Sequence, residues 1–155
     1  MSSPTQRAAS PLPSMLLALA VTAVIFAPTL LLNPDEMSDI PGFAVAIWLV
    51  LIAVCPATAA ALANRRKPAA TTMARALVIG GPQWPLVMGL VYLDVWIDVQ
   101  SGHLMAGSGA EAMAFGVGLV FAAVPGVILT CAVTLAAFAA ADSASHRTPS
   151  TGGPD

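Results

Sequence analysis

Apolar residues occupy four long stretches of this chain that contain no charged side chain. These stretches are 27, 25, 18 and 30 residues long and cover positions 8–34, 40–64, 76–93 and 112–141. The hydrocarbon core of a bilayer is about 30 Å thick and needs about 20 residues of helix to cross. The pattern therefore predicts four membrane-spanning helices, at about 12–32, 41–63, 72–99 and 111–141.

The composition identifies lipid as the solvent for most of the 155 residues. Hydrophobic residues make up 57% of the chain and charged residues only 9%, against about 25% charged residues in soluble domains. Spans must be helices or closed barrels, and these alanine-, leucine- and valine-rich runs lack the alternation of barrel strands. We therefore expect an all-α integral membrane four-helix bundle of two antiparallel helical hairpins at 12–141, between flexible cytoplasmic tails at 1–11 and 142–155.

The charges predict an orientation for this bundle. All six basic residues fall on one side of the predicted spans: Arg7, Arg65, Arg66, Lys67, Arg75 and Arg147. The positive-inside rule makes that side cytoplasmic, so both termini are expected inside. The alanine-rich spans, with five arginines to one lysine, favour the cytoplasmic (inner) membrane of a bacterium.

The third predicted span contains a sequence that disfavours a continuous helix. Its inner half reads Gly80, Gly81, Pro82, Gln83, Trp84 and Pro85. Each proline removes a backbone donor and clashes one turn back, so we expect a bend or break here, a candidate gate. Gln83 is the only asparagine or glutamine inside the predicted spans and needs a hydrogen-bond partner in lipid.

The fourth predicted span carries small residues at a spacing of four. Gly118, Ala122 and Gly126 would lie along one face of the helix, which is the pattern that lets membrane helices approach closely. This stripe is the candidate packing face, either within the chain's own bundle or against another protein.

Acidic residues gather on the predicted outer side. Asp94 and Asp98 lie four apart on one helix face, Glu111 begins the fourth span, and Asp35, Glu36 and Asp39 belong to the first outer turn. His103 is the one outer side chain that could be cationic. If Asp94, Asp98 and Glu111 converge, they form a mouth that attracts cations; ordinary water-facing carboxylates at helix ends are the simpler reading.

No recognised catalytic or cofactor motif accompanies these features. The two histidines, His103 and His146, lie outside the predicted spans, and no metal-ligand spacing, nucleotide-binding loop or nucleophile motif is present. We expect no enzyme activity, no cofactor and no nucleic-acid partner. A lipid-processing enzyme ranks third, behind an accessory subunit and a cation pore.

Two functions remain open on the sequence alone. The first is a nonenzymatic accessory or regulatory subunit that packs against another membrane protein through its helices. The alternative is a homo-oligomeric cation pore or small ion-coupled transporter, for example a membrane-depolarising effector, whose acidic outer mouth gathers ions. Both involve membrane lipids, and either a second protein or further copies of this chain.

Overall fold

The computed structural model describes residues 10–31, 40–65, 73–104, 107 and 109–145. Within these ranges 89% of the residues are helical and none lies in a strand. The elements are α1 (Leu12–Phe26), the 3-10 helix η1 (Thr29–Leu31), α3 (Gly42–Arg65), α4 (Met73–Gly80), α5 (Gln83–Gln100) and α6 (Gly109–Ser145). The all-α prediction is confirmed at this level.

Within the described residues, three helical segments are long and apolar enough to cross a membrane. They are Gly42–Arg65, the combined α4 and α5 from Met73 to Gln100, and Gly109–Ser143. α1 is apolar but only 15 residues long, about 22 Å of helix. The predicted first span at 12–32 is thus helical in two pieces, because Pro28 cannot donate within a helix and disfavours helix one turn before it.

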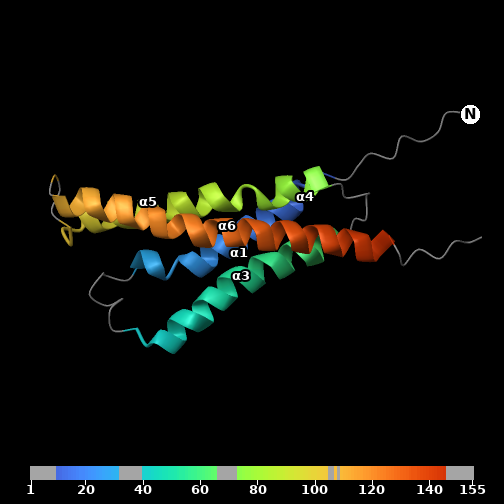
Figure 1. The fold of residues 1–155 in the computed structure, drawn as a ribbon, viewed down its shortest axis with the longest axis horizontal. Coiled ribbons are helices and arrows are strands. Elements are labelled where there is room, and N and C mark those ends of the chain that lie inside the picture. The colour runs from blue at the N-terminus through green and yellow to red at the C-terminus, as the bar shows by residue number, and fades with distance from the viewer. Residues whose placement is uncertain (1–9, 32–39, 66–72, 105–106, 108, 146–155) are drawn as a thin grey trace, which may run out of the picture.

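The helices run along one common direction. In Figure 1, α1 and α4 begin at the end of the molecule where α3 and α6 finish, and the α5–α6 connection lies at the opposite end. The tails at 1–9 and 146–155, the first outer turn at 32–39, and Arg66 and Lys67 lie outside the described residues. α6 continues to Ser145, so helix extends into the segment expected as a tail.

The core is built from residues spaced four apart. In α1 the buried positions are Ser14, Ala18, Thr22 and Phe26, and in α3 they are Ile52, Pro56, Ala60 and Asn64. The alanines are fully buried, and such small side chains let helix backbones approach closely. α6 contacts α3, α4 and α5, while α1 lies mainly against α3.

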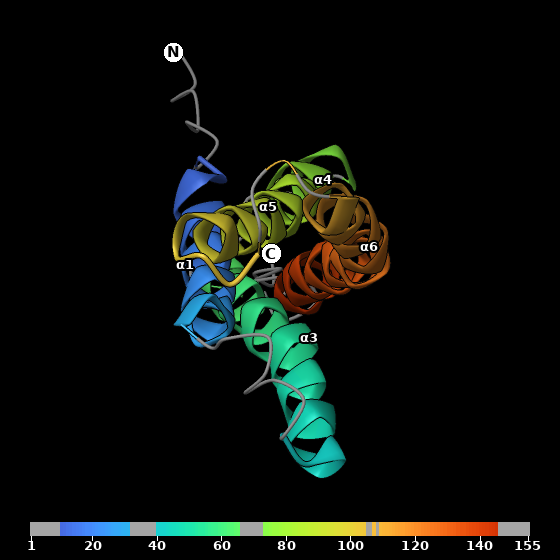
Figure 2. The same ribbon diagram turned by 90° about the vertical axis from the view of Figure 1, so that its left-hand side faces the viewer.

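α3 is packed over only its second half. None of the residues from Gly42 to Leu51 is buried, although Ala44 and Trp48 are half-buried. Figure 2 shows this first half of α3 projecting away from the other helices. A pocket lies between α3 and the α5–α6 pair where they diverge.

Candidate functional site

The predicted third span is broken into two helices at its prolines. α4 ends at Gly80 and α5 begins at Gln83, with the Gly81 N–H donating to the Leu77 carbonyl at 2.7 Å. Pro82 and Pro85 have no N–H, so the carbonyls of Val78 and Gly81 lack their usual donor one turn ahead. The break is therefore a place inside an apolar span where backbone groups need other partners.

The break lies in close contact with α6 at Gly80. A Cβ atom placed on Gly80 would lie 2.0 Å from Thr134 Oγ1, 2.8 Å from the Thr130 carbonyl oxygen and 2.9 Å from the Thr134 nitrogen. No side chain fits at these distances. Gly81, its neighbour, would meet only the Leu77 carbonyl of its own helix, at 2.8 Å. Gly80 is thus the residue that sets the close approach of α4 to α6.

Gln83 joins the other side of the break to α1. Its side chain is completely buried, and Thr22 Oγ1 lies 2.7 Å from Gln83 Oε1 and 3.0 Å from the Ala18 carbonyl oxygen. One terminal atom of the amide, Nε2, has no hydrogen-bond partner within the described structure. The hydroxyls of Thr130 and Thr134 are also buried without a partner.

The small-residue stripe of α6 packs on α5. A Cβ on Gly118 would lie 3.2 Å from Val91 Cγ1, and one on Gly126 would lie 2.7 Å from Trp84 Cδ1. Ala122, between them, is only 4% exposed. The stripe therefore contributes to packing within this chain, and Trp84 fills the space left by Gly126.

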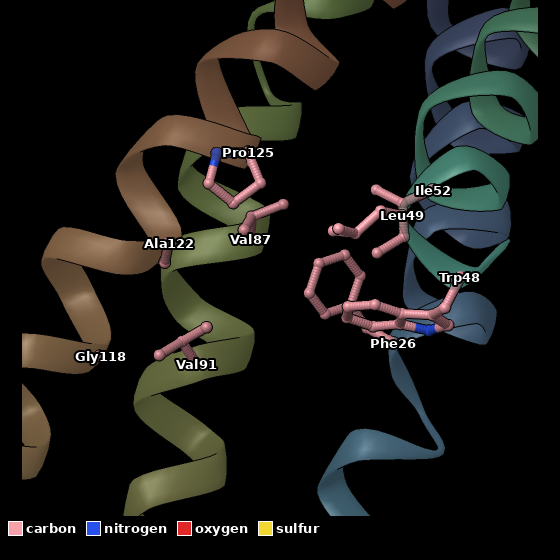
Figure 3. Close-up of a pocket in the computed structure, with 9 residues that line it drawn as sticks. All are labelled: Phe26, Trp48, Leu49, Ile52, Val87, Val91, Gly118, Ala122 and Pro125. Atoms are coloured by element: carbon pink, nitrogen blue, oxygen red, sulfur yellow. The ribbon is translucent and has the colours of Figure 1, made fainter. Parts of the chain in front are cut away.

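Gly118 and Ala122 also line a lateral pocket of about 240 Å³. Figure 3 shows its two walls facing each other, one from α1 and α3 and the other from α5 and α6. The lining residues are all apolar or aromatic: Phe26, Trp48, Leu49, Ile52, Val87, Val91, Gly118, Ala122 and Pro125.

The aromatic wall of this pocket is fixed in place by its own contacts. Trp48 Nε1 donates to the Ile25 carbonyl oxygen at 3.0 Å, which ties α3 to α1. Its ring meets Phe26 edge to face, with centroids 5.2 Å apart. Because the indole N–H is already bonded, this wall presents only apolar surface to whatever enters.

The acidic candidates belong to two helices, Asp94 and Asp98 to α5 and Glu111 to α6. Asp94 and Asp98 lie one turn apart on α5, and the Asp98 carboxylate is 3.8 Å from His103 Nδ1, which also lies 2.7 Å from Ser101 Oγ. Glu111, in the first turn of α6, accepts the Gly107 N–H. Among the described residues, no three histidine, cysteine or acidic side chains are placed to hold a metal ion.

Comparison with known proteins adds no candidate function. No family model, no curated protein and no solved structure matches this chain. The conclusions below therefore rest on the geometry and chemistry of this chain.

Several residues of this region were not predicted from the sequence. Nothing in the local sequence marks Thr22 or Trp48 as a residue that joins helices, although Thr22 lies on the four-residue spacing of the buried α1 face. Asn64 lies inside α3 because that helix continues to Arg65, so Gln83 is not the only amide in a span. Asn64 is buried and its Nδ2 donates to the Ala137 carbonyl oxygen at 2.8 Å, joining α3 to α6.

Proposed function

We propose that the protein is a four-span bundle of a bacterial cytoplasmic membrane with both termini inside. α1 and η1 together run from Leu12 to Leu31, which is about the 20 residues that a bilayer requires. The one-sided placement of the basic residues supports this orientation. The α5–α6 connection with His103, and the adjoining end of α5 with Asp98, would then face out.

Within that membrane the protein acts as a nonenzymatic accessory or regulatory subunit of a larger assembly. The observation that carries the proposal is the lateral pocket between the diverging half of α3 and the α5–α6 pair. A helix that leaves its neighbours over half its length gives up van der Waals contacts inside the chain. A transmembrane helix of a partner, inserting an apolar side chain, would supply them.

The size and lining of the pocket support this use. An apolar cavity of about 150 Å³ is enough to bind benzene in a soluble protein, and this pocket measures about 240 Å³. It is therefore large enough for an aromatic side chain of a partner helix. Helices associate in lipid mainly through close packing, and the small side chains of Gly118 and Ala122 in the pocket wall favour such an approach.

The test fills the pocket from within the protein. Ala122→Leu adds three carbons at a position lining the pocket, and Ala139→Leu makes the same change at an exposed position on the same helix. The protein is extracted gently from its own membrane and its stoichiometric partners are weighed by native mass spectrometry. Loss of the partner with Ala122→Leu but not with Ala139→Leu supports the proposal; retention in both refutes it.

The pore alternative has one observation in its favour. Asp94 and Asp98 are half-buried on the same α5 face, within the segment Met73–Gln100 that is long enough to span. Carboxylates within membrane segments are uncommon and often serve ion pathways. This alternative makes a different prediction for ion flux, which is given in the Discussion.

A further inference from the structure

The break between α4 and α5 contains more hydrogen-bonding groups than the surrounding protein satisfies. Gln83 is the eleventh residue of the 28-residue segment Met73–Gln100, well inside the apolar span. Its immediate helical neighbours on the buried face, Ile79 and Val87, are completely buried and apolar. They offer no partner for the amide.

The amide of Gln83 keeps one unsatisfied end in either orientation. The Thr22 hydroxyl has a single hydrogen, which it can donate to the Ala18 carbonyl or to Gln83 Oε1, at 3.0 Å and 2.7 Å. Turning the amide over would let Nε2 donate to Thr22 and would leave Oε1 as the unmatched atom. A buried terminal amide atom therefore needs an additional partner in both cases.

Two backbone carbonyls beside the break also lack their usual helical donor. The carbonyls of Val78 and Gly81 lack the N–H that Pro82 and Pro85 do not have. Across the contact with Gly80, the hydroxyls of Thr130 and Thr134 are buried without partners. Leaving such groups unsatisfied in hydrocarbon is strongly unfavourable.

We propose that the break is a buried water site, in which ordered water bonds to the Gln83 amide and to the carbonyls freed by Pro82 and Pro85. Water is the ligand of choice because it donates and accepts, so it serves carbonyls, hydroxyls and either end of the amide. Waters that re-satisfy backbone groups at proline breaks are a recognised way for membrane helices to tolerate them. This inference does not depend on the proposed function.

Nuclear magnetic resonance can test the site directly, because the chain has only three glutamines: Gln6, Gln83 and Gln100. The protein is labelled with ¹⁵N-glutamine on a deuterated background and placed in deuterated detergent. Gln83→Leu identifies the Gln83 side-chain amide signal. We expect that signal to show a nuclear Overhauser cross-peak to water, with exposed Gln100 as the positive control.

A control removes cross-peaks that are relayed by nearby hydroxyl groups. Hydroxyl hydrogens exchange with water and relay its signal, so Thr22→Val, and separately Thr130→Val with Thr134→Val, eliminate the nearby hydroxyls. Persistence of the cross-peak in both variants supports bound water. Its absence in the wild type, or its loss in either variant, overturns the proposal.

Discussion

Replacing Gly80 by alanine tests the close contact between α4 and α6. The new Cβ would lie 2.0 Å from Thr134 Oγ1 and below 3.0 Å from two backbone atoms of α6. A threonine side chain can rotate, but the backbone atoms of a packed helix cannot move without shifting the whole element. α4 and α6 must therefore separate, or one of them must bend.

The size of the effect follows from these contacts. Overpacking a close interface costs about 1–3 kcal/mol, and the upper part of that range applies because two of the three contacts are to backbone. Alanine in place of glycine favours helix by at most about 1 kcal/mol, and less at Gly80, which is the last residue of α4. We expect Gly80→Ala to lower the free energy of unfolding by about 2 kcal/mol.

Gly89→Ala is the matched control, because a Cβ there meets nothing within 4 Å and the residue lies inside α5. It should leave stability unchanged or raise it by up to about 1 kcal/mol. Both variants are unfolded in mixed micelles by increasing the fraction of dodecyl sulfate. Tryptophan fluorescence reports unfolding, because Trp48 and Trp84 both take part in helix contacts. Equal stabilities for the two variants would refute the close approach of α4 to α6.

Three further predictions follow from the site. Thr22→Val and Gln83→Leu should show a coupling of about 0.6–1.7 kcal/mol in a double-mutant cycle of unfolding, as membrane hydrogen bonds do; zero coupling would contradict the Thr22–Gln83 hydrogen bond. If the protein is an accessory subunit, liposomes containing it should leak cations no faster than empty ones, and Asp94→Asn with Asp98→Asn should change nothing; flux that this double variant abolishes would favour the pore. With the two native cysteines removed, His103→Cys should react with a membrane-impermeant thiol reagent in intact cells. A fluorescent protein fused to the C-terminus should report a cytoplasmic location. The opposite pair of results would reverse the predicted orientation.

The helices could be predicted from the sequence because each contains an uncharged run bounded by charges or turn residues. The observed α3 and α5 end within two residues of the predicted limits. The break at Gly81–Pro82 was also predictable, since the chemistry of proline acts locally. The early end of α1 at Phe26 was missed, although Pro28 lies two residues beyond it.

The faces of the helices could not be predicted in the same way. A lipid-facing side chain is as apolar as a buried one, so hydrophobicity alone does not distinguish the exposed first half of α3 from its packed second half. The pairing of Thr22 with Gln83 joins residues 61 positions apart, and no local rule connects them. The lateral pocket could not be predicted either, because it arises where α3 diverges from the other helices.

The central claim is that this chain works as part of an assembly with another protein. Native mass spectrometry of the wild-type protein, extracted gently from the membrane of the cells that make it, measures this directly. The account predicts a complex in which this chain is present in a fixed ratio with a different membrane protein. A chain that is found only alone, or only in complexes with further copies of itself, would contradict the account.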